Sequence, residues 1–165
     1  EIEKGYNIHY IDEEKPLGTG GGLSLLKDII KETFVLSNCD ILIDADYEKI
    51  YRQHKSRGNI ITMVCSVKKI NIPYGVIDID SDGNIESMKE KPEYSFITNT
   101  GMYFAEPKVI DELKNNEATG FPDIIQKYKD AGEKIGVYPI SETAWMDMGQ
   151  LNELEQMRKK IEQHE

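Results

Sequence analysis

The stretch FVLSNCDILI, residues Phe34 to Ile43, joins a nearly continuous apolar run to a single carboxylate at Asp40. Its apolar part, TFVLSNC, is typical of a strand covered on both faces. An ionised carboxylate with no partner in an apolar setting costs several kcal/mol or is protonated. Ligands of α/β folds bind at the carboxyl ends of strands, which is where this side chain is expected. Asp40 is therefore the first candidate site residue.

The segments on either side alternate between strand-like and helix-like patterns. Strands are expected at 7–11, 33–39, 59–67, 95–105, 134–140 and 143–148, and helices at 22–31, 45–58, 106–116, 121–132 and 151–165. Asp44 or Asp46 is suited to cap the helix 45–58, and Gly58 is suited to end it. The turn SDGN makes residues 74–91 a hairpin. We therefore expect one α/β domain over residues 1–165, with a mixed, mostly parallel sheet and layers on both faces.

Composition narrows the class of partner. The 165 residues carry a net charge of -10, which argues against a general nucleic-acid surface or an acidic membrane surface. No apolar run approaches the roughly 20 residues that a membrane span needs. Cys39 and Cys65 each lie in an apolar run without metal-ligand spacing, so we interpret both as small buried thiols of a cytoplasmic protein.

A second aspartate repeats the pattern of the first. Asp147, in AWMDMGQ, is another carboxylate among apolar residues at the end of a strand pattern. Either aspartate alone is better explained as a cap of the following turn or helix. Together they predict a Mg²⁺ site, because Mg²⁺ is typically bound by one or two protein carboxylates plus substrate phosphates and water. Asp40 and Asp44 also suggest a metal-dependent glycosyltransferase, but their spacing is wrong for D-x-D and this alternative ranks last.

Other segments are compatible with a ligand and with a purely structural role. PLGTGGGL fits neither the dinucleotide fingerprint nor the phosphate loop, and it predicts either a backbone that approaches a ligand or a flexible turn. Glycines in NTGMYF and IPYGVI indicate a close approach or a bulge. In MKEKP, Glu90 suits sugar hydroxyls and Lys91 a phosphate, with Pro92 favouring an extended Lys91; a solvated charge cluster is the alternative. His54 is expected on an exposed helix face.

Taken in order, these segments resemble the sugar-phosphate nucleotidyltransferases, the family of mannose-1-phosphate guanylyltransferases and glucose-1-phosphate uridylyl- and thymidylyltransferases. The segments are PLGTGGGL, LSNCDIL, YGVIDID, EKPEYSFITNTGMYF, FPDIIQ and WMDMGQLNELEQM. NCDIL and NTGMY are most similar to guanylyltransferases. The resemblance covers nearly the whole chain and implies a Rossmann-like α/β/α nucleotidyltransferase fold. It also implies the Mg²⁺-dependent reaction of an NTP with a sugar 1-phosphate, giving an NDP-sugar and pyrophosphate.

The resemblance also implies a role for particular residues. By their place in the motifs, Asp40 and Asp147 would hold Mg²⁺, and Lys91 would bind the sugar phosphate, which makes these three the expected catalytic residues. The nucleobase would lie near Gly18 and Thr19. The sugar would be bound by Gly75, Glu90, Asn99 and Gly101.

One family feature does not occur in this sequence. Family members begin with a strand and a glycine-rich loop, G-G-x-G-T-R-L, that grips the NTP phosphates, and neither is found here. We therefore expect an N-terminally truncated chain, the C-terminal two-thirds of the family fold. Alone it would turn over little substrate and could form a homo-oligomer through an exposed sheet edge. The alternative function is a non-catalytic sugar-nucleotide-binding or regulatory module.

Overall fold

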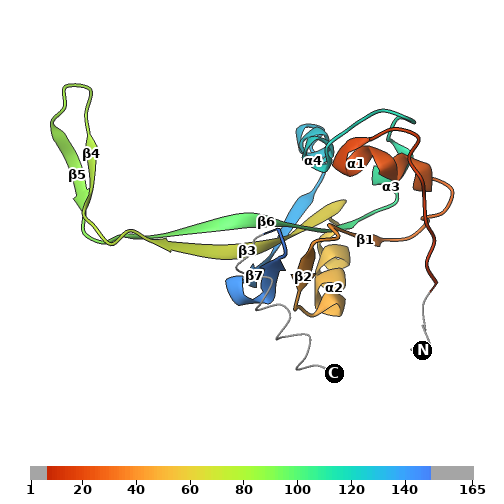
Figure 1. Cartoon of the computed structure of the whole chain (residues 1–165), viewed down its shortest axis with the longest axis horizontal. Coiled ribbons are helices and arrows are strands. Elements are labelled where there is room, and N and C mark those ends of the chain that lie inside the picture. Colours follow the sequence, from red (N-terminus) through yellow and green to blue (C-terminus); the bar gives the residue numbers. More distant parts are fainter. Residues whose placement is uncertain (1–6, 150–165) are drawn as a thin grey trace.

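The computed structural model describes residues 7–149, and Figure 1 shows their arrangement. The helical elements are α1 (Gly18–Gly21), η1 (Gly22–Leu26), α2 (Tyr47–Arg57), α3 (Lys108–Asp111), α4 (Phe121–Asp130) and η2 (Glu142–Ala144). The strands are β1 (Phe34–Ser37), β2 (Ile41–Ile43), β3 (Ile61–Asn71), β4 (Val76–Ile79), β5 (Ile85–Lys89), β6 (Glu93–Ala105), β7 (Ile135–Ser141) and β8 (Trp145–Asp147). The helix expected over residues 151–165 lies outside the described residues. Within residues 7–149, no helix has both the length and the apolar character that crossing a bilayer requires.

The central sheet has the strand order β1-β6-β3-β7. β6 is antiparallel to both β1 and β3, while β7 is parallel to β3. β1, β3 and β7 therefore run in one direction and β6 in the other, which confirms the mixed α/β sheet. The expected mostly parallel pairing was wrong for the described residues, because β6 lies between β1 and β3 and leaves β3 with β7 as the one parallel pair of this sheet. β2 pairs with β8, and β4 with β5, in two small antiparallel sheets.

Apolar side chains cover both faces of the central sheet, because successive residues of a strand point to opposite sides. In β6, Tyr103 and Ala105 pack into a core cluster that includes residues of α3 and α4. Met102 and Phe104 pack into a second cluster with residues of β2 and α2. The result is the expected arrangement with a layer on each face of the sheet.

Helix α2 confirms its sequence signals. The Asp46 side chain accepts the Lys49 backbone N–H at 2.9 Å, and Gly58 ends the helix at φ 62°. The hairpin is also confirmed: β4 and β5 are joined by a turn with Gly83 at φ 85°. In Figure 1 this hairpin stands at the far end of a long two-stranded ribbon formed by β3 and β6.

Several local expectations were wrong. Residues 7–11 form no strand. The helix expected at 22–31 is only the short 3-10 helix η1 followed by a turn. β1 pairs only with β6 among the described residues, and Val35 is 45% exposed, so β1 is an edge strand of the described sheet rather than a doubly covered one.

Candidate active site

A cavity of about 660 Å³ lies where β1 ends, beside the middle of β6 and the end of β8. It collects side chains from widely separated parts of the chain. Its lining residues are Thr19, Leu36, Ser37, Asn38, Cys39, Asp40, Ile41, Asn99, Thr100, Gly101, Tyr103, Phe121, Pro122, Trp145 and Asp147. Five residues predicted from the sequence are among them: Thr19, Asp40, Asn99, Gly101 and Asp147.

Asp40 and Asp147 are brought together by the pairing of β2 with β8. Asp147 is directly opposite Ile41, and the Met148 N–H donates to the Asp40 carbonyl at 2.8 Å. Neighbouring strands lie roughly 4.8 Å apart, so the backbones of the two aspartates are adjacent although far apart in the sequence. Asp40 is exposed, and Oδ1 of Asp147 accepts the Gly149 N–H at 2.9 Å. Asp40 therefore avoids the cost of apolar burial by facing the open cavity.

The described lining of the cavity has acidic side chains and no basic ones. Among the described lining residues, Asp40 and Asp147 are the only acidic ones, and none is Lys, Arg or His. A phosphate entering this space would meet two carboxylates and no side-chain cation. Within residues 7–149, no three acidic, His or Cys side chains are close enough to hold a metal among themselves. A donor set of two carboxylates fits Mg²⁺, which usually keeps water and substrate oxygens as further ligands.

A bulge in β6 shapes the cavity wall. Val64 of β3 pairs with Met102, but the next residue, Cys65, pairs with Asn99, which leaves Thr100 and Gly101 as extra residues in β6. Gly101 has φ 87°, a conformation that strongly favours glycine. The bulge, one of the two alternatives expected for NTGMYF, is therefore confirmed.

Asn38 is a lining residue that the sequence interpretation missed. A Cβ added to Gly101 would lie 2.6 Å from Nδ2 of Asn38, so the Asn38 side chain takes the space that a side chain at 101 would need. The Asn38 N–H also donates to the Gly101 carbonyl at 3.0 Å. The only local signal was an amide two residues before Asp40, whereas its neighbour in space comes from a distant part of the chain.

The aromatic wall of the cavity is held by Asn99. Its Nδ2 donates to the Tyr103 hydroxyl at 2.5 Å, and its Oδ1 accepts the Gly101 N–H at 3.1 Å. The ring centroids of Tyr103 and Phe121 are 4.4 Å apart. Burial raises the pKa of Tyr103, so its hydroxyl stays protonated at neutral pH. Trp145 also lines the cavity, and its buried Nε1 has no hydrogen-bond partner.

The glycine-rich loop lies beside the cavity, which it lines through Thr19. The backbone N–H groups of Gly20 and Gly21 both donate to the Thr119 carbonyl, at 2.9 and 3.1 Å. These two N–H groups are therefore engaged within the fold, as the structural interpretation of PLGTGGGL expects. Gly18 does not line the cavity and has φ 76°, while the hydroxyl of Thr19 accepts the Phe121 N–H at 3.0 Å.

The remaining predicted residues lie at the base of the β4–β5 hairpin. A Cβ on Gly75 would be 3.2 Å from Oε2 of Glu90, so these two residues are neighbours. Lys91 has φ 43°, so the extended conformation expected before Pro92 was wrong. Lys91 lies before β6, and from the first residue of that strand, Glu93, to Asn99 an extended strand of six residues spans roughly 20 Å. The structure thus forms two groups of predicted residues and does not bring Lys91 to the aspartates.

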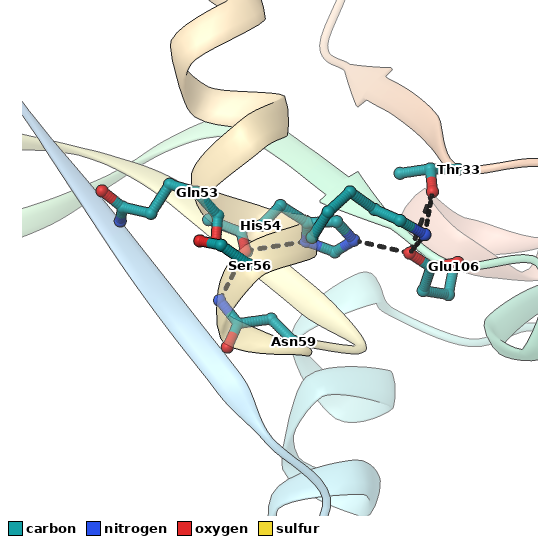
Figure 2. A network of polar contacts seen from close by, with 8 residues as sticks. Thr33, Gln53, His54, Ser56, Asn59 and Glu106 are labelled. Carbon is teal, nitrogen blue, oxygen red and sulfur yellow. Dashed lines mark hydrogen bonds and ion pairs between the residues drawn. The ribbon is translucent and has the colours of Figure 1, made fainter.

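Two expectations about exposure were also wrong. His54 is fully buried, because α2 packs this side of the helix on β3 and β6. Figure 2 shows it within a polar network with Glu106 and its neighbours. Cys39 is exposed in the cavity lining because it lies beyond the end of β1, whereas Cys65 is buried as expected.

Comparison with known proteins identifies the family of this chain. A family model described as nucleotidyl transferase matches residues 1–164. The chain is 32% identical over 157 residues to the catalytic subunit beta of mannose-1-phosphate guanylyltransferase from Drosophila pseudoobscura pseudoobscura, covering 88% of this chain and 40% of that protein. It is 33% identical over 164 residues to the mannose-1-phosphate guanyltransferase of Saccharomyces cerevisiae, covering 91% of this chain and 43% of the relative. The chain thus spans less than half the length of these two relatives.

Solved structures support the fold. HddC from Yersinia pseudotuberculosis, in complex with GMP-PN, superposes with a TM-score of 0.64 at 23% identity, over 92% of this chain and 65% of that one. The expected nucleotidyltransferase fold is therefore confirmed. With a family match over nearly its full length, the chain belongs to the nucleotidyl transferase family.

Proposed function

We propose that this chain carries the metal-binding and sugar-binding part of a sugar-1-phosphate nucleotidyltransferase site, with GTP as the preferred nucleotide. The observation that carries the proposal is that Asp40, directly before β2, and Asp147, the last residue of β8, line one cavity whose described lining has no basic side chain. The guanylyltransferase names of the relatives support the choice of nucleotide and make mannose 1-phosphate the first sugar to test.

In this proposal Asp40 and Asp147 hold Mg²⁺, which supplies the positive charge that neighbouring phosphates require. An oxygen of the sugar 1-phosphate attacks the α-phosphorus of the NTP, the bond to the β-phosphate oxygen breaks, and pyrophosphate leaves. No covalent intermediate with the protein is needed. The chain's contribution is to bind and orient the reactants, with Asn99 and Gly101 on the sugar side and Gly18 and Thr19 on the nucleobase side.

Lys91, Glu90 and Gly75 belong to the same proposal as phosphate and sugar contacts. Since they lie at the hairpin base, their participation requires the β3–β6 ribbon to bend toward the cavity. Without that movement the described lining of the cavity offers a phosphate no cation other than the metal. We therefore propose that the chain alone binds ligand with Mg²⁺ and turns over little.

A non-catalytic binding module is the second candidate. It is favoured by the same separation of Lys91 from the aspartates, because a site that only holds a sugar nucleotide needs no arrangement for in-line attack. The two candidates differ in one observable, the release of pyrophosphate.

The test is a pyrophosphate-release assay with GTP, UTP, dTTP or CTP against a panel of sugar 1-phosphates, run on this chain and on a longer protein that contains it. We expect release in the longer protein, highest with GTP and mannose 1-phosphate, and lost in Asp40→Asn and Asp147→Asn. Asp46→Asn is the matched control, since Asn caps a helix as well as Asp does and this position is outside the cavity. Binding of an NDP-sugar without release from any pair would favour the binding module.

Two further parts of the proposal concern the protein's surroundings. A cytoplasmic location is supported by two free cysteines, since a reducing compartment preserves them. A homo-oligomer formed through the outer edge of β1 is supported by that edge having no strand partner among the described residues. Light scattering on the purified chain tests the second point, and a monomer at all concentrations would contradict it.

A further inference from the structure

The contact between Asn38 and Gly101 crosses from the end of β1 to the bulge of β6. The Asn38 amide nitrogen lies 2.6 Å from the ideal Cβ position of Gly101, and Cγ lies 2.9 Å from it. A backbone hydrogen bond of 3.0 Å from the Asn38 N–H to the Gly101 carbonyl fixes the same two segments. The carboxamide of Asn38 is therefore held against Gly101 at the cavity wall, two residues before Asp40.

Two carboxamides lie beside Gly101, and they differ in what they already bind. Asn99 uses its oxygen for the Gly101 N–H and its nitrogen for the Tyr103 hydroxyl. Asn38 is exposed in the cavity lining, and its side chain makes no hydrogen bond to a residue within 7–149. The carboxamide that has its full hydrogen-bonding capacity available to a ligand is that of Asn38.

We propose that the Asn38 carboxamide is a substrate-binding group that reads the hydroxyls of the sugar ring, and that Gly101 is its positioning residue. This inference rests on the proposed function and adds a specificity determinant to that site. A carboxamide offers two donors and one acceptor oxygen, which matches neighbouring hydroxyls that each donate and accept. Being neutral, it suits a hydroxyl-bearing ligand next to Asp40, where a lysine would pair with the carboxylate.

Epimeric sugars give the sharpest readout. Mannose 1-phosphate and glucose 1-phosphate differ only in the orientation of one ring hydroxyl, so they test hydroxyl recognition at constant charge. In the longer protein we expect Asn38→Ala to raise KM for the preferred sugar 1-phosphate by about tenfold, the effect of roughly one lost hydrogen bond. Discrimination between the epimers should shrink, and KM for the NTP should stay the same.

Gly101→Ala tests the positioning role through a double-mutant comparison. A methyl group at 101 pushes against the Asn38 amide, so the single variant should weaken sugar binding to a similar extent. In an Asn38→Ala background the same change should affect sugar binding little, although the φ of 87° destabilises the fold in both backgrounds. Thermal unfolding separates these two effects. Asn71→Ala is the matched control, an exposed asparagine at the distal end of β3.

The outcomes distinguish this inference from the proposed function. Turnover by the wild type with unchanged sugar KM and epimer discrimination in Asn38→Ala would overturn the role of Asn38 alone. Additive effects of the two substitutions on sugar binding would overturn the positioning role of Gly101. A wild-type protein that neither turns over nor binds any sugar 1-phosphate, measured by calorimetry with Mg²⁺, would overturn both proposals.

Discussion

The imidazole Nε2 of His54 lies 3.0 Å from Oε1 of Glu106, with the ring fully buried between α2 and the sheet. Nδ1 is 2.8 Å from the Thr62 hydroxyl, and that hydroxyl accepts from the Asn59 amide. Glu106 also accepts from Lys55 at 2.8 Å and from Thr33 at 2.9 Å. These contacts, visible in Figure 2, join the start of β1 to the end of β6 and to α2.

This network predicts a loss of stability in mild acid. Burial lowers the pKa of His54, only partly offset by Glu106, so the folded state favours the neutral ring. The unfolded chain therefore binds more protons once the pH falls below the unperturbed value of about 6.5. The free energy of unfolding should therefore fall as the pH drops from about 7 toward the lower pKa of the folded state. Because one imidazole takes up at most one proton, this fall is at most about 1.4 kcal/mol per pH unit.

Glu106 contributes at lower pH. Burial opposes its ionisation, but hydrogen bonds from Lys55, Thr33 and His54 outweigh that effect and lower its pKa. The stability that Glu106 contributes is fully present above the ordinary pKa of a carboxyl group. It is lost as the pH falls through the lower pKa of Glu106 in the folded state. Urea unfolding of the wild type and of His54→Gln at several pH values separates the two groups. If the free energy of unfolding falls with pH equally steeply in both proteins between pH 7 and 5, His54 does not titrate in this way.

A second prediction concerns divalent metal at the paired aspartates. Mn²⁺, a paramagnetic substitute for Mg²⁺, should broaden the amide signals of residues 38–41 and 145–148 and leave those of the hairpin turn at 81–84 sharp. Asp40→Asn or Asp147→Asn should raise the Mn²⁺ concentration that produces this broadening at least tenfold, because each removes one of two charged ligands. Broadening centred on the hairpin acidic residues instead would place the metal elsewhere.

A third prediction concerns packing of the glycine loop. A Cβ on Gly21 would lie 2.4 Å from the Glu117 carbonyl oxygen and 3.1 Å from Cβ of Leu17. Since the first obstacle is backbone, Gly21→Ala should lower the free energy of unfolding by about 2 kcal/mol. At Gly22 the obstacle is the far end of the Glu13 side chain, which can shift at the cost of its hydrogen bond from the Leu17 N–H, so Gly22→Ala is a matched control with a smaller loss. Chemical denaturation measures both, and equal losses would contradict the packing argument.

The parts of the fold that were predicted from the sequence depend on local signals. The caps of α2 at Asp46 and Gly58 and the turn of the β4–β5 hairpin follow from neighbouring residues and were confirmed. The parts that failed depend on distant residues. His54 looked exposed among charged neighbours, but it is buried against Thr62 on β3 and Glu106 directly after β6.

The candidate site divides in the same way. The convergence of Asp40 and Asp147 follows from both aspartates lying at strand ends, and the β2–β8 pairing brings them together. The contact of Asn38 with Gly101 has no local signal, because it depends on a two-residue bulge opposite β3. Lys91 was predicted as a phosphate ligand from the MKEKP pattern and from the family resemblance, and in the structure it stands at the far end of the ribbon.

The two cysteines give a last prediction, which reports on the cavity directly. Cys39 lines the cavity and is exposed, while Cys65 is buried in β3, where burial also raises the pKa of its thiol. A thiolate-selective reagent should therefore modify one thiol of the native protein, and Cys39→Ser should abolish that reaction. An NDP-sugar with Mg²⁺ should slow the modification several-fold, because ligand and thiol share the cavity. Asp40→Asn should remove this protection while leaving the rate without ligand nearly unchanged. Two thiols reacting at similar rates in the native protein, or protection that survives in Asp40→Asn, would show that the ligand does not bind beside the paired aspartates.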